Sequence, residues 1–245
     1  MNSSDLNKKQ KSVWKAIDCR FSELVKEYGS IIYCRKKWLN GSVYDGCLDV
    51  ARYVKAPVHI MWILKEHNDQ PPRDEEGHLV AFADCLGPAD DEEVIQFRRN
   101  VSSYRSLRLI ERASRFLLNL PEGDSTEAFK SVAIVNLGKC PGENKTPDSR
   151  LDDLVEWWGD ILKRQVSDYK PDVVIVPGSH FSRVAKLLAC NQKNGKFRKG
   201  MACAELYTDG NLPVIRNQNP SWFGCKEEDW MCVLSKAFAK ALPHV

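Results

Sequence analysis

The stretch VHIMWIL, residues 58–64, is apolar at every position except His59, and the polar stretch KEHND, residues 65–69, follows it directly. A short run that is apolar on both faces is typical of a strand buried in a parallel sheet. In open α/β sheets, ligands bind beyond the carboxyl ends of the strands. The stretch therefore predicts an α/β fold, and the polar residues after it are the first candidates for a functional site.

Three further stretches have the same apolar character, at residues 131–136, 172–176 and 212–215. Helical spacing of apolar residues predicts helices between and around them, at residues 5–28, 44–54, 92–120, 148–162, 181–189 and 230–238. Strands that alternate with helices form a parallel sheet covered on both faces. We therefore predict a central parallel four-stranded sheet flanked by helices, in a single domain over residues 1–245. Residues 1–55 would form a helical N-terminal extension packed on that domain.

Composition excludes several classes of protein. Hydrophobic residues make up 43% and charged residues 28% of the chain, as in ordinary soluble globular proteins. No secretory signal and no apolar run long enough for a membrane helix is present, which predicts a cytoplasmic protein with no membrane partner. The nine cysteines include no C-x-x-C pair, so a zinc or redox site is disfavoured. The net charge of +3 is only weak support for a nucleic-acid partner.

The expected helix over residues 92–120 carries a row of arginines on one face. The row consists of Arg98, Arg105, Arg108, Arg112 and Arg115. Such a row can follow a phosphate backbone. The alternative, a solvated face with local ion pairs, is the interpretation that we favour.

Unusual residues gather at the ends of three expected strands: in residues 66–69, with residues 77–82 after them, at Asn136, and in residues 217–223. An Asn amide offers a donor and an acceptor to a pyrimidine edge, an aromatic ring can stack on a base, and a carboxylate can orient water or offset positive charge on a sugar. These are the groups needed to hold a base that has left the DNA stack and to cleave its bond to the sugar.

Four segments resemble the uracil-DNA glycosylase superfamily, between about residues 58 and 223. VAIVN at 132–136 is similar to the family strand whose terminal Asn reads the flipped pyrimidine, and GHLVAF at 77–82 to the segment whose aromatic residue stacks on it. Residues 173–180 resemble the strand and glycine-containing turn before the next helix. NPS at 219–221 looks like the His-Pro-Ser motif of the family, in the Asn-Pro-Ser form of its mismatch-specific branch.

The resemblance implies a monofunctional DNA glycosylase, an enzyme that needs no metal or nucleotide cofactor and whose partner is DNA with one nucleotide flipped out. Asn136 would read the base and Phe82 would stack on it, with His67 as a further base-binding candidate. Asn219 would contact the base or its leaving-group oxygen. Lys65 leaves a Schiff-base lyase reaction open.

The resemblance leaves more than one candidate for the catalytic residue. In the family the first strand ends in a glycine-containing turn with a catalytic Asp or Asn, but residues 64–69 contain no glycine. Counting back from Phe82 selects Asp69, whereas counting forward from the strand end selects Glu66 or His67. We favour Asp69, then Glu66, with Asn68 as an orienting residue.

The departures from the family pattern bear on the base. Asn219 replaces the His that polarises the pyrimidine O2 in the uracil-specific branch, and it donates a weaker hydrogen bond. The superfamily also contains members that remove mismatched or bulky modified pyrimidines, including those of phage DNA. The missing glycine indicates a reshaped pocket, which fits a base other than uracil. The biological role would be either repair or defence against phage DNA.

Further residues are candidates for contact with the DNA. Those for the phosphate backbone are Lys139, Lys145, Ser179 and Ser221, and those for a wedge inserted into the duplex are Trp222 and Phe223. Structural alternatives stand beside these roles: Trp222 can pack on the last helix, Asn136 can cap the next loop, and Phe82 can belong to the core.

Two other functions compete with a monomeric glycosylase. The first is a catalytically inactive protein of the same fold that binds modified DNA. The second is a small-molecule hydrolase or nucleotide-binding protein, which the absence of GxGxxG, P-loop and GxSxG motifs disfavours.

Overall fold

The computed structural model describes residues 1–28, 42–65, 79–80, 92–123, 125–140, 148–209, 212–218 and 224–244. Its helices are α1 (Ser3–Tyr28), α2 (Val50–Lys55), α3 (Glu92–Ser103), α4 (Arg105–Leu117), α5 (Ser125–Lys130), α6 (Asp148–Tyr169), α7 (Phe181–Leu187) and α8 (Glu227–Ala241). Its strands are β1 (Val43–Tyr44), β2 (Gly46–Cys47), β3 (Ile60–Leu64), β4 (Leu79–Val80), β5 (Ala133–Asn136), β6 (Val173–Pro177), β7 (Lys193–Lys199), β8 (Ala202–Asp209) and β9 (Leu212–Asn217).

The central sheet contains the four predicted strands and three others. Its order is β2-β5-β3-β6-β9-β8-β7, and the neighbours among β5, β3, β6 and β9 pair in parallel. The expected α/β class is therefore confirmed. The expected size is wrong, because β2, β8 and β7 add antiparallel strands and give a mixed sheet of seven. Strands β1 and β4 form a separate parallel pair.

The additional strands carry little of the hydrophobic signal that identifies a buried strand. Strand β7 has the sequence KNGKFRK, and only Gly195 and Phe197 in it are not exposed. Strand β2 has only two residues. Pairing with a neighbour, not burial of an apolar face, defines both strands, so the sequence pattern did not predict them.

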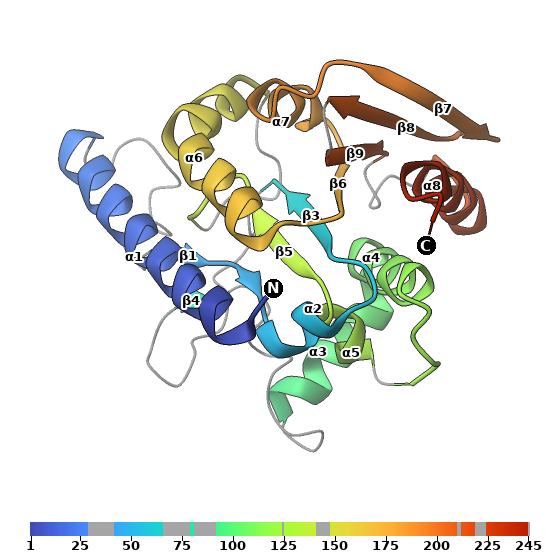
Figure 1. Ribbon diagram of the computed structural model, residues 1–245, viewed down its shortest axis with the longest axis horizontal. Coiled ribbons are helices and arrows are strands. Elements are labelled where there is room, and N and C mark those ends of the chain that lie inside the picture. The colour runs from blue at the N-terminus through green and yellow to red at the C-terminus, as the bar shows by residue number, and fades with distance from the viewer. Residues whose placement is uncertain are drawn as a thin grey trace.

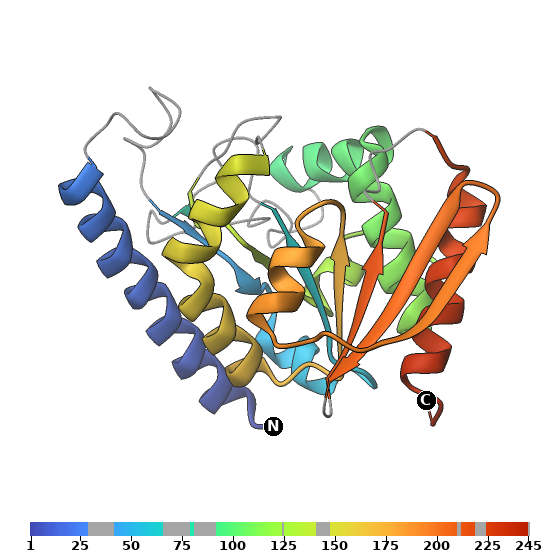
Figure 2. The same cartoon turned by 90° about the horizontal axis from the view of Figure 1, so that it is seen from above.

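Helices cover the two faces of the sheet in two separate groups (Figures 1 and 2). Side chains along each strand alternate between the faces. Met61 and Ile63 of β3 join one apolar core with residues of α1, α6 and α7, on what we call the α6 face. Ile60 and Trp62 join a second core with residues of α3, α4 and α8, on the α8 face. Strands β5, β3 and β6 are thus buried on both sides, as their apolar sequences predict, and β9 is buried except towards its ends, where Arg216 is exposed.

The expected helix over residues 92–120 is two helices. Helix α3 ends at Ser103 and α4 begins at Arg105, with the extended backbone of Tyr104 between them. The arginine row also has structural partners. Arg108 and Arg112 of α4 contact the Glu227 carboxylate of α8 at 2.6 and 3.0 Å. The favoured interpretation, a face with local ion pairs, describes these arginines.

The expected helix over residues 44–54 is also wrong in its first half. Gly46 has φ +137°, and a side chain at this position would collide with the Tyr169 hydroxyl. This glycine lets the chain form β2 beside β5, and α2 starts only after Asp49, whose carboxylate accepts a hydrogen bond from the Arg52 amide at 3.0 Å.

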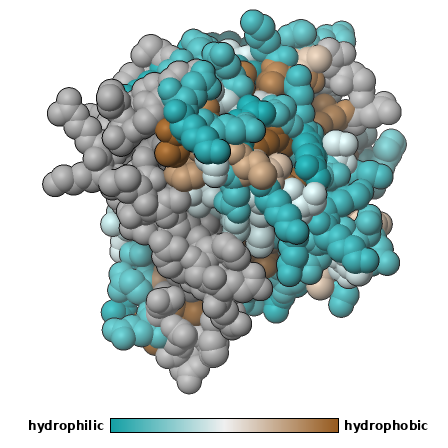
Figure 3. Space-filling model, turned by 90° about the vertical axis from the view of Figure 1, so that its left-hand side faces the viewer, coloured by the Kyte–Doolittle hydropathy of each residue, from teal (hydrophilic) through white to brown (hydrophobic). Residues whose placement is uncertain are grey.

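Helix α1, predicted from its apolar spacing, packs along α6 (Figure 1). The Arg20 guanidinium joins the two helices by donating to the Trp157 carbonyl and to the Asp160 carboxylate, both at 3.0 Å. Figure 3 shows this side of the molecule, where the described surface is largely hydrophilic with smaller hydrophobic areas. Among the described residues, no helix is both long and apolar enough to cross a membrane.

Candidate functional site

The four parallel strands all end at one edge of the sheet, which we call the carboxyl edge (Figure 2). Their last residues are Leu64, Asn136, Pro177 and Asn217. Leu64 pairs with Asn136, and Pro177 pairs with Asn217. Ligands of open α/β sheets bind beyond this edge, so we take it as the candidate site.

Asn136 is buried at the end of β5, with 2% of its surface exposed. It lies two residues after Ile134, which belongs to the core of the α8 face, so its side chain is on that face as well. The backbone amide of Asn136 donates to the Asp45 carboxylate at 2.6 Å. The side-chain Nδ2 has no hydrogen-bond partner among the described residues. Such a donor costs about 1–3 kcal/mol and calls for a partner.

Asn217 repeats this arrangement at the end of β9, where it is 1% exposed. Its Oδ1 accepts a hydrogen bond from the Gln218 amide at 2.8 Å, but its Nδ2 has no partner in the described part of the chain. Asn217 follows Ile215 of the α8-face core by two residues, as Asn136 follows Ile134. The two amides thus share one face of one edge, three strand spacings or about 14 Å apart.

Asn217 begins one of the segments predicted to carry functional residues, but the sequence predicts no role for Asn217 itself. A signal was present in the matched endings Ile134-Val135-Asn136 and Ile215-Arg216-Asn217. In each, an amide replaces the next inward-facing apolar residue at the end of a strand.

The assignment of Lys139 to a DNA phosphate is wrong. Its side chain is fully buried, and its Nζ lies 2.9 and 2.8 Å from the two carboxylate oxygens of Asp45 and 2.7 Å from the Gln165 side-chain oxygen. Burial lowers the pKa of the Lys139 ammonium, and the Asp45 carboxylate acts in the opposite direction. This lysine is held inside the protein, out of reach of a DNA backbone.

The Asp45–Lys139 pair has a structural consequence for the site. The Asp45 carboxylate also accepts hydrogen bonds from the Asn136 amide and, at 2.7 Å, from the side chain of Gln165 in α6. A buried charge pair is tolerated when its remaining hydrogen-bonding atoms are satisfied in this way. The network fixes the end of β5 and so positions the Asn136 side chain.

His180 supports the carboxyl edge at the end of β6. The Ile63 carbonyl faces β6 at the level where Pro177 has no amide hydrogen to offer. The Nε2 of His180 lies 2.9 Å from this carbonyl oxygen and takes the place of the missing donor. Burial lowers the pKa of His180 to about 4, so its imidazole is neutral at neutral pH.

Hydrogen bonds anchor the chain at three points next to the segments that carry predicted site residues. The Lys65 carbonyl accepts a hydrogen bond from the Gly138 amide at 2.8 Å, directly before the polar segment 66–69. The Gln218 side chain binds the Cys203 amide at 3.0 Å and the Met201 carbonyl at 2.9 Å, directly before segment 219–223. After that segment, Arg105 donates to the Cys225 carbonyl at 2.6 Å.

Most of the predicted site residues follow these anchored points in sequence but lie outside the described residues. They are Glu66, His67, Asn68, Asp69, Phe82, Lys145, Asn219, Ser221, Trp222 and Phe223. Ser179 is described, and it lies exposed in the turn between β6 and α7. Its phosphate contact, like the roles of the other residues, stays a prediction.

No group of three or more His, Cys, Asp or Glu side chains in the described ranges is arranged to hold a metal ion. The described cysteines form no disulfide. Burial raises the pKa of Cys47, so this thiol stays protonated and unreactive.

Comparisons with known proteins include a distant structural similarity. No protein-family model matches the sequence, and no curated protein matches it. A solved structure of a domain of unknown function (DUF1537) from Bordetella bronchiseptica, a domain-swapped dimer with bound citrate, aligns with a TM-score of 0.31 and 16% identity. The alignment covers 77% of this chain and 43% of that one. The chain thus spans less than half the length of that structure, and a similarity of this size assigns it neither a family nor a function.

Proposed function

We propose that the protein is a DNA glycosylase that flips a pyrimidine out of DNA and hydrolyses its N-glycosidic bond. The observation that carries the proposal is the pair of buried amides, Asn136 and Asn217, each with an unpaired Nδ2 on the same face of the carboxyl edge. Native proteins pair nearly all buried polar groups. Two unpaired donors at the edge where α/β folds bind ligands support a ligand with several acceptor atoms.

A flipped nucleotide supplies such acceptors at both of its ends. The pyrimidine edge carries carbonyl oxygens or a ring nitrogen, which the Asn136 amide can bind. The distance of about 14 Å between the amides, three strand spacings, exceeds the width of one base. We therefore assign Asn136 to the base and Asn217 to the sugar-phosphate end of the same nucleotide.

The catalytic carboxylate would come from the segment that follows β3. Strand β3 lies beside β5, between the two amides in the strand order, and Lys65 at its end is held by Gly138. Asp69, or else Glu66, would direct water to the C1′ carbon of the sugar and stabilise its positive charge, with Asn68 orienting it. The bond from C1′ to the base breaks and the base leaves with the bonding electrons. The water oxygen bonds to C1′, its proton passes to the carboxylate, and an abasic sugar remains in the DNA.

Other residues of the family resemblance complete the site. Phe82 would stack on the base, His67 would line its pocket, and Asn219 would donate a hydrogen bond to the leaving base. Trp222 and Phe223 would fill the gap in the duplex. An Asn at position 219 favours a mismatched or bulky modified pyrimidine over uracil, including the modified pyrimidines of phage DNA.

The experiment is base release from defined duplexes. Duplexes that carry uracil, a mismatched thymine or a glucosylated pyrimidine are incubated with the protein, and abasic sites are detected by alkaline cleavage. Asn136→Ala should lower the rate of release by roughly 10- to 100-fold, since losing one hydrogen bond of this kind costs about 1–3 kcal/mol. Asn191→Ala, a change of an exposed amide away from the edge, serves as the matched control.

Each outcome assigns a function. Release of one base, reduced in Asn136→Ala and abolished in the double variant Glu66→Ala/Asp69→Ala, supports the glycosylase. Selective binding of a modified duplex with no release from any substrate would establish the alternative, an inactive binder of modified DNA. Equal release by the Asn136→Ala and Asn191→Ala variants would contradict the assignment of Asn136.

A further inference from the structure

Part of the α6 face is not covered by any described helix. Helix α7 ends at Leu187, and beyond it β7, the adjoining part of β8 and the end of β9 face outward (Figure 2). Val214 of β9 and Tyr207 of β8 still pack against the core of the α6 face. The opposite side of the same strands packs on α8. We call the uncovered side the hairpin face, because it consists mainly of the β7–β8 hairpin.

The hairpin face carries an excess of positive charge. Its cations are Lys193, Lys196 and Arg198 of β7 and Arg216 of β9. Lys196 and Arg216 contact the Glu205 carboxylate of β8 at 3.5 and 3.1 Å, and Lys193 contacts it as well, which places these side chains on one side of the sheet. Arg198 lies two residues beyond Lys196 and therefore points the same way.

The Glu205 carboxylate contacts three of these four cations. It is buried, with 6% of its surface exposed. Burial acts to raise the pKa of Glu205, but hydrogen bonds from Lys193 and Tyr207 outweigh it and bring this pKa to about 2. Lys193, Lys196 and Arg216 share this carboxylate, so the hairpin face keeps an excess of positive charge, and Arg198 has no acidic partner among the described residues.

Protection of an edge strand explains only part of this charge. Lysines on an exposed edge such as β7 prevent pairing with another chain. Arg216, however, lies on β9, between β6 and β8 in the interior of the sheet, and its side chain is 50% exposed. It also lies over the Phe181 ring, 5.6 Å from the ring centre, on the same face. The positive surface thus extends inward, beyond the edge.

The hairpin face is continuous with the carboxyl edge. Arg216 directly precedes Asn217, and Ala204 of β8 pairs with Asn217, so the hairpin turn after Lys199 projects past the end of β9. The carbonyl of Met201 in that turn accepts a hydrogen bond from Gln218 at 2.9 Å. A polyanion along this face would therefore lead to the candidate site.

We propose that the hairpin face binds the phosphate backbone of duplex DNA next to the flipped nucleotide. That the polyanion is DNA rests on the proposed function. That it binds at the hairpin face rests on the charge and exposure of Lys196, Arg198 and Arg216. Contacts of this kind position a duplex without reading its sequence. The release of cations from DNA on binding makes them dependent on salt.

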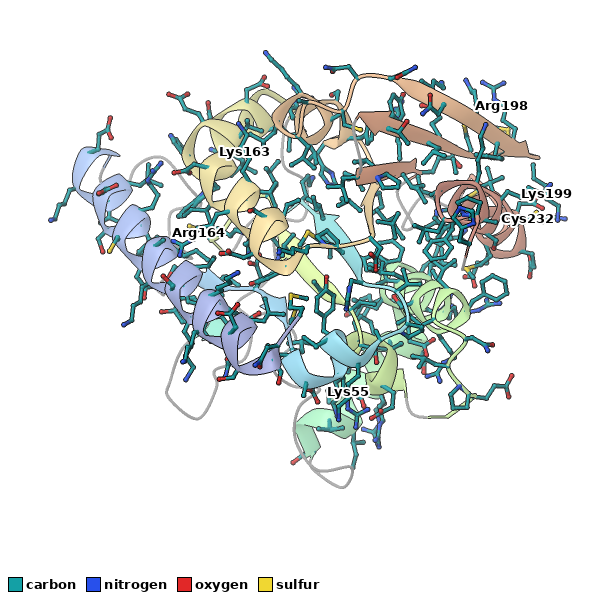
Figure 4. All side chains as sticks on the ribbon, in the orientation of Figure 1. Lys55, Lys163, Arg164, Arg198, Lys199 and Cys232 are labelled. Carbon is teal, nitrogen blue, oxygen red and sulfur yellow. The ribbon has the colours of Figure 1, made fainter. Side chains whose placement is uncertain are left out.

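The test is the salt dependence of DNA binding, measured by fluorescence anisotropy on a labelled duplex that contains no modified base. The test variant is Lys196→Gln/Arg198→Gln, which leaves Lys193 and Arg216 to hold Glu205. The control variant, Lys55→Gln/Lys163→Gln, removes the same charge from exposed positions on α2 and α6, away from the hairpin (Figure 4). Thermal unfolding of both variants checks that the fold is retained.

The test variant should bind at least about tenfold more weakly at 0.1 M salt, and its slope of log Kd against log salt should fall by about two. The control should bind as the wild type does. Equal binding by both variants, tighter binding of a polyglutamate peptide than of DNA, or no binding of DNA by the wild type would overturn the proposal. If the wild type binds DNA in a salt-dependent way, the test variant loses this binding, and no base is released, the DNA-binding role of the hairpin face is supported and the proposed glycosylase activity is refuted.

Discussion

Pro177 cannot donate a hydrogen bond to the Ile63 carbonyl, and the neutral imidazole of His180 does so instead. Because His180 is buried and its pKa is lowered to about 4, its protonation is coupled to unfolding. An unfolded chain, in which histidine has a pKa near 6.5, takes up the proton first as the pH falls. The free energy of unfolding should therefore be constant above about pH 6.5 and decrease as the pH falls from there to about 4.

We expect His180 to account for a decrease of up to about 3 kcal/mol across this pH range. The variant His180→Gln keeps a donor for the Ile63 carbonyl but does not titrate, so its unfolding free energy should depend less on pH. Urea unfolding of both proteins at pH 7, 5.5 and 4.5 measures the difference. Identical pH dependence in the two proteins would mean that another group dominates it.

The amino-acid pattern predicted the position of Asn136 but not the surroundings of Lys139. A polar residue at the end of an apolar strand can be placed at the carboxyl edge from the period of the strand alone. Lys139 has a local sequence typical of a surface loop, and its partner Asp45 lies 94 positions earlier in the chain. Only the folded contacts of β2, β5 and α6 bring the two together.

At the scale of elements, Glu227 joins α8 to α4. Its carboxylate accepts hydrogen bonds from Arg108 and Arg112, and the side chain is only 17% exposed. The contacts of Arg108 lower the pKa of Glu227. Helix α8 covers β8 and β9 from the side opposite the hairpin face, so this clamp also supports the hairpin.

Glu227→Gln should lower the free energy of unfolding by about 1–2 kcal/mol, because hydrogen bonds to charged groups contribute that much. Glu228→Gln is a matched control: it removes the same charge from the same turn of α8, but from an exposed position. Its effect should stay within about 0.5 kcal/mol. Urea unfolding midpoints compare the two, and equal midpoints would show that the clamp contributes nothing.

The elements that sequence alone predicted are those that bury an apolar surface. Strands β3, β5, β6 and β9 and helices α1, α6 and α8 all have a period that matches their burial. Strand β7 and the break at Tyr104 have no such signal, since their geometry depends on neighbours distant in sequence. Strand β8 carries only a short one, in the alternate buried residues Ala202, Ala204 and Leu206. Apolar periodicity therefore identified the parallel centre of the sheet and missed its antiparallel margins.

For the molecule as a whole, α1 is part of the packed structure. Val13 and Ile17 are fully buried in the core of the α6 face, and Gln10 exchanges hydrogen bonds with the backbone of Cys47 at 2.9 Å. Removal of methyl groups from such a site leaves a cavity. A substitution in the buried face of α1 should consequently lower the stability of the whole domain.

Ile17→Ala should destabilise the protein by about 2–5 kcal/mol. Val25→Ala on the same helix, where the side chain is 41% exposed, should change the stability by less than about 0.5 kcal/mol. Circular dichroism in the far and near ultraviolet should report one common transition in urea for each variant. A separate early transition would instead describe α1 as an independent unit.

The anchors around segment 219–223 have an evolutionary consequence. Gln218 on one side and Cys225 on the other are tied to the hairpin turn and to α4, so neither end of the segment relies on the residues between them. Lengthening a loop between fixed ends costs little free energy. Exchanges and insertions in this stretch should therefore be tolerated in evolution while the rest of the framework is retained.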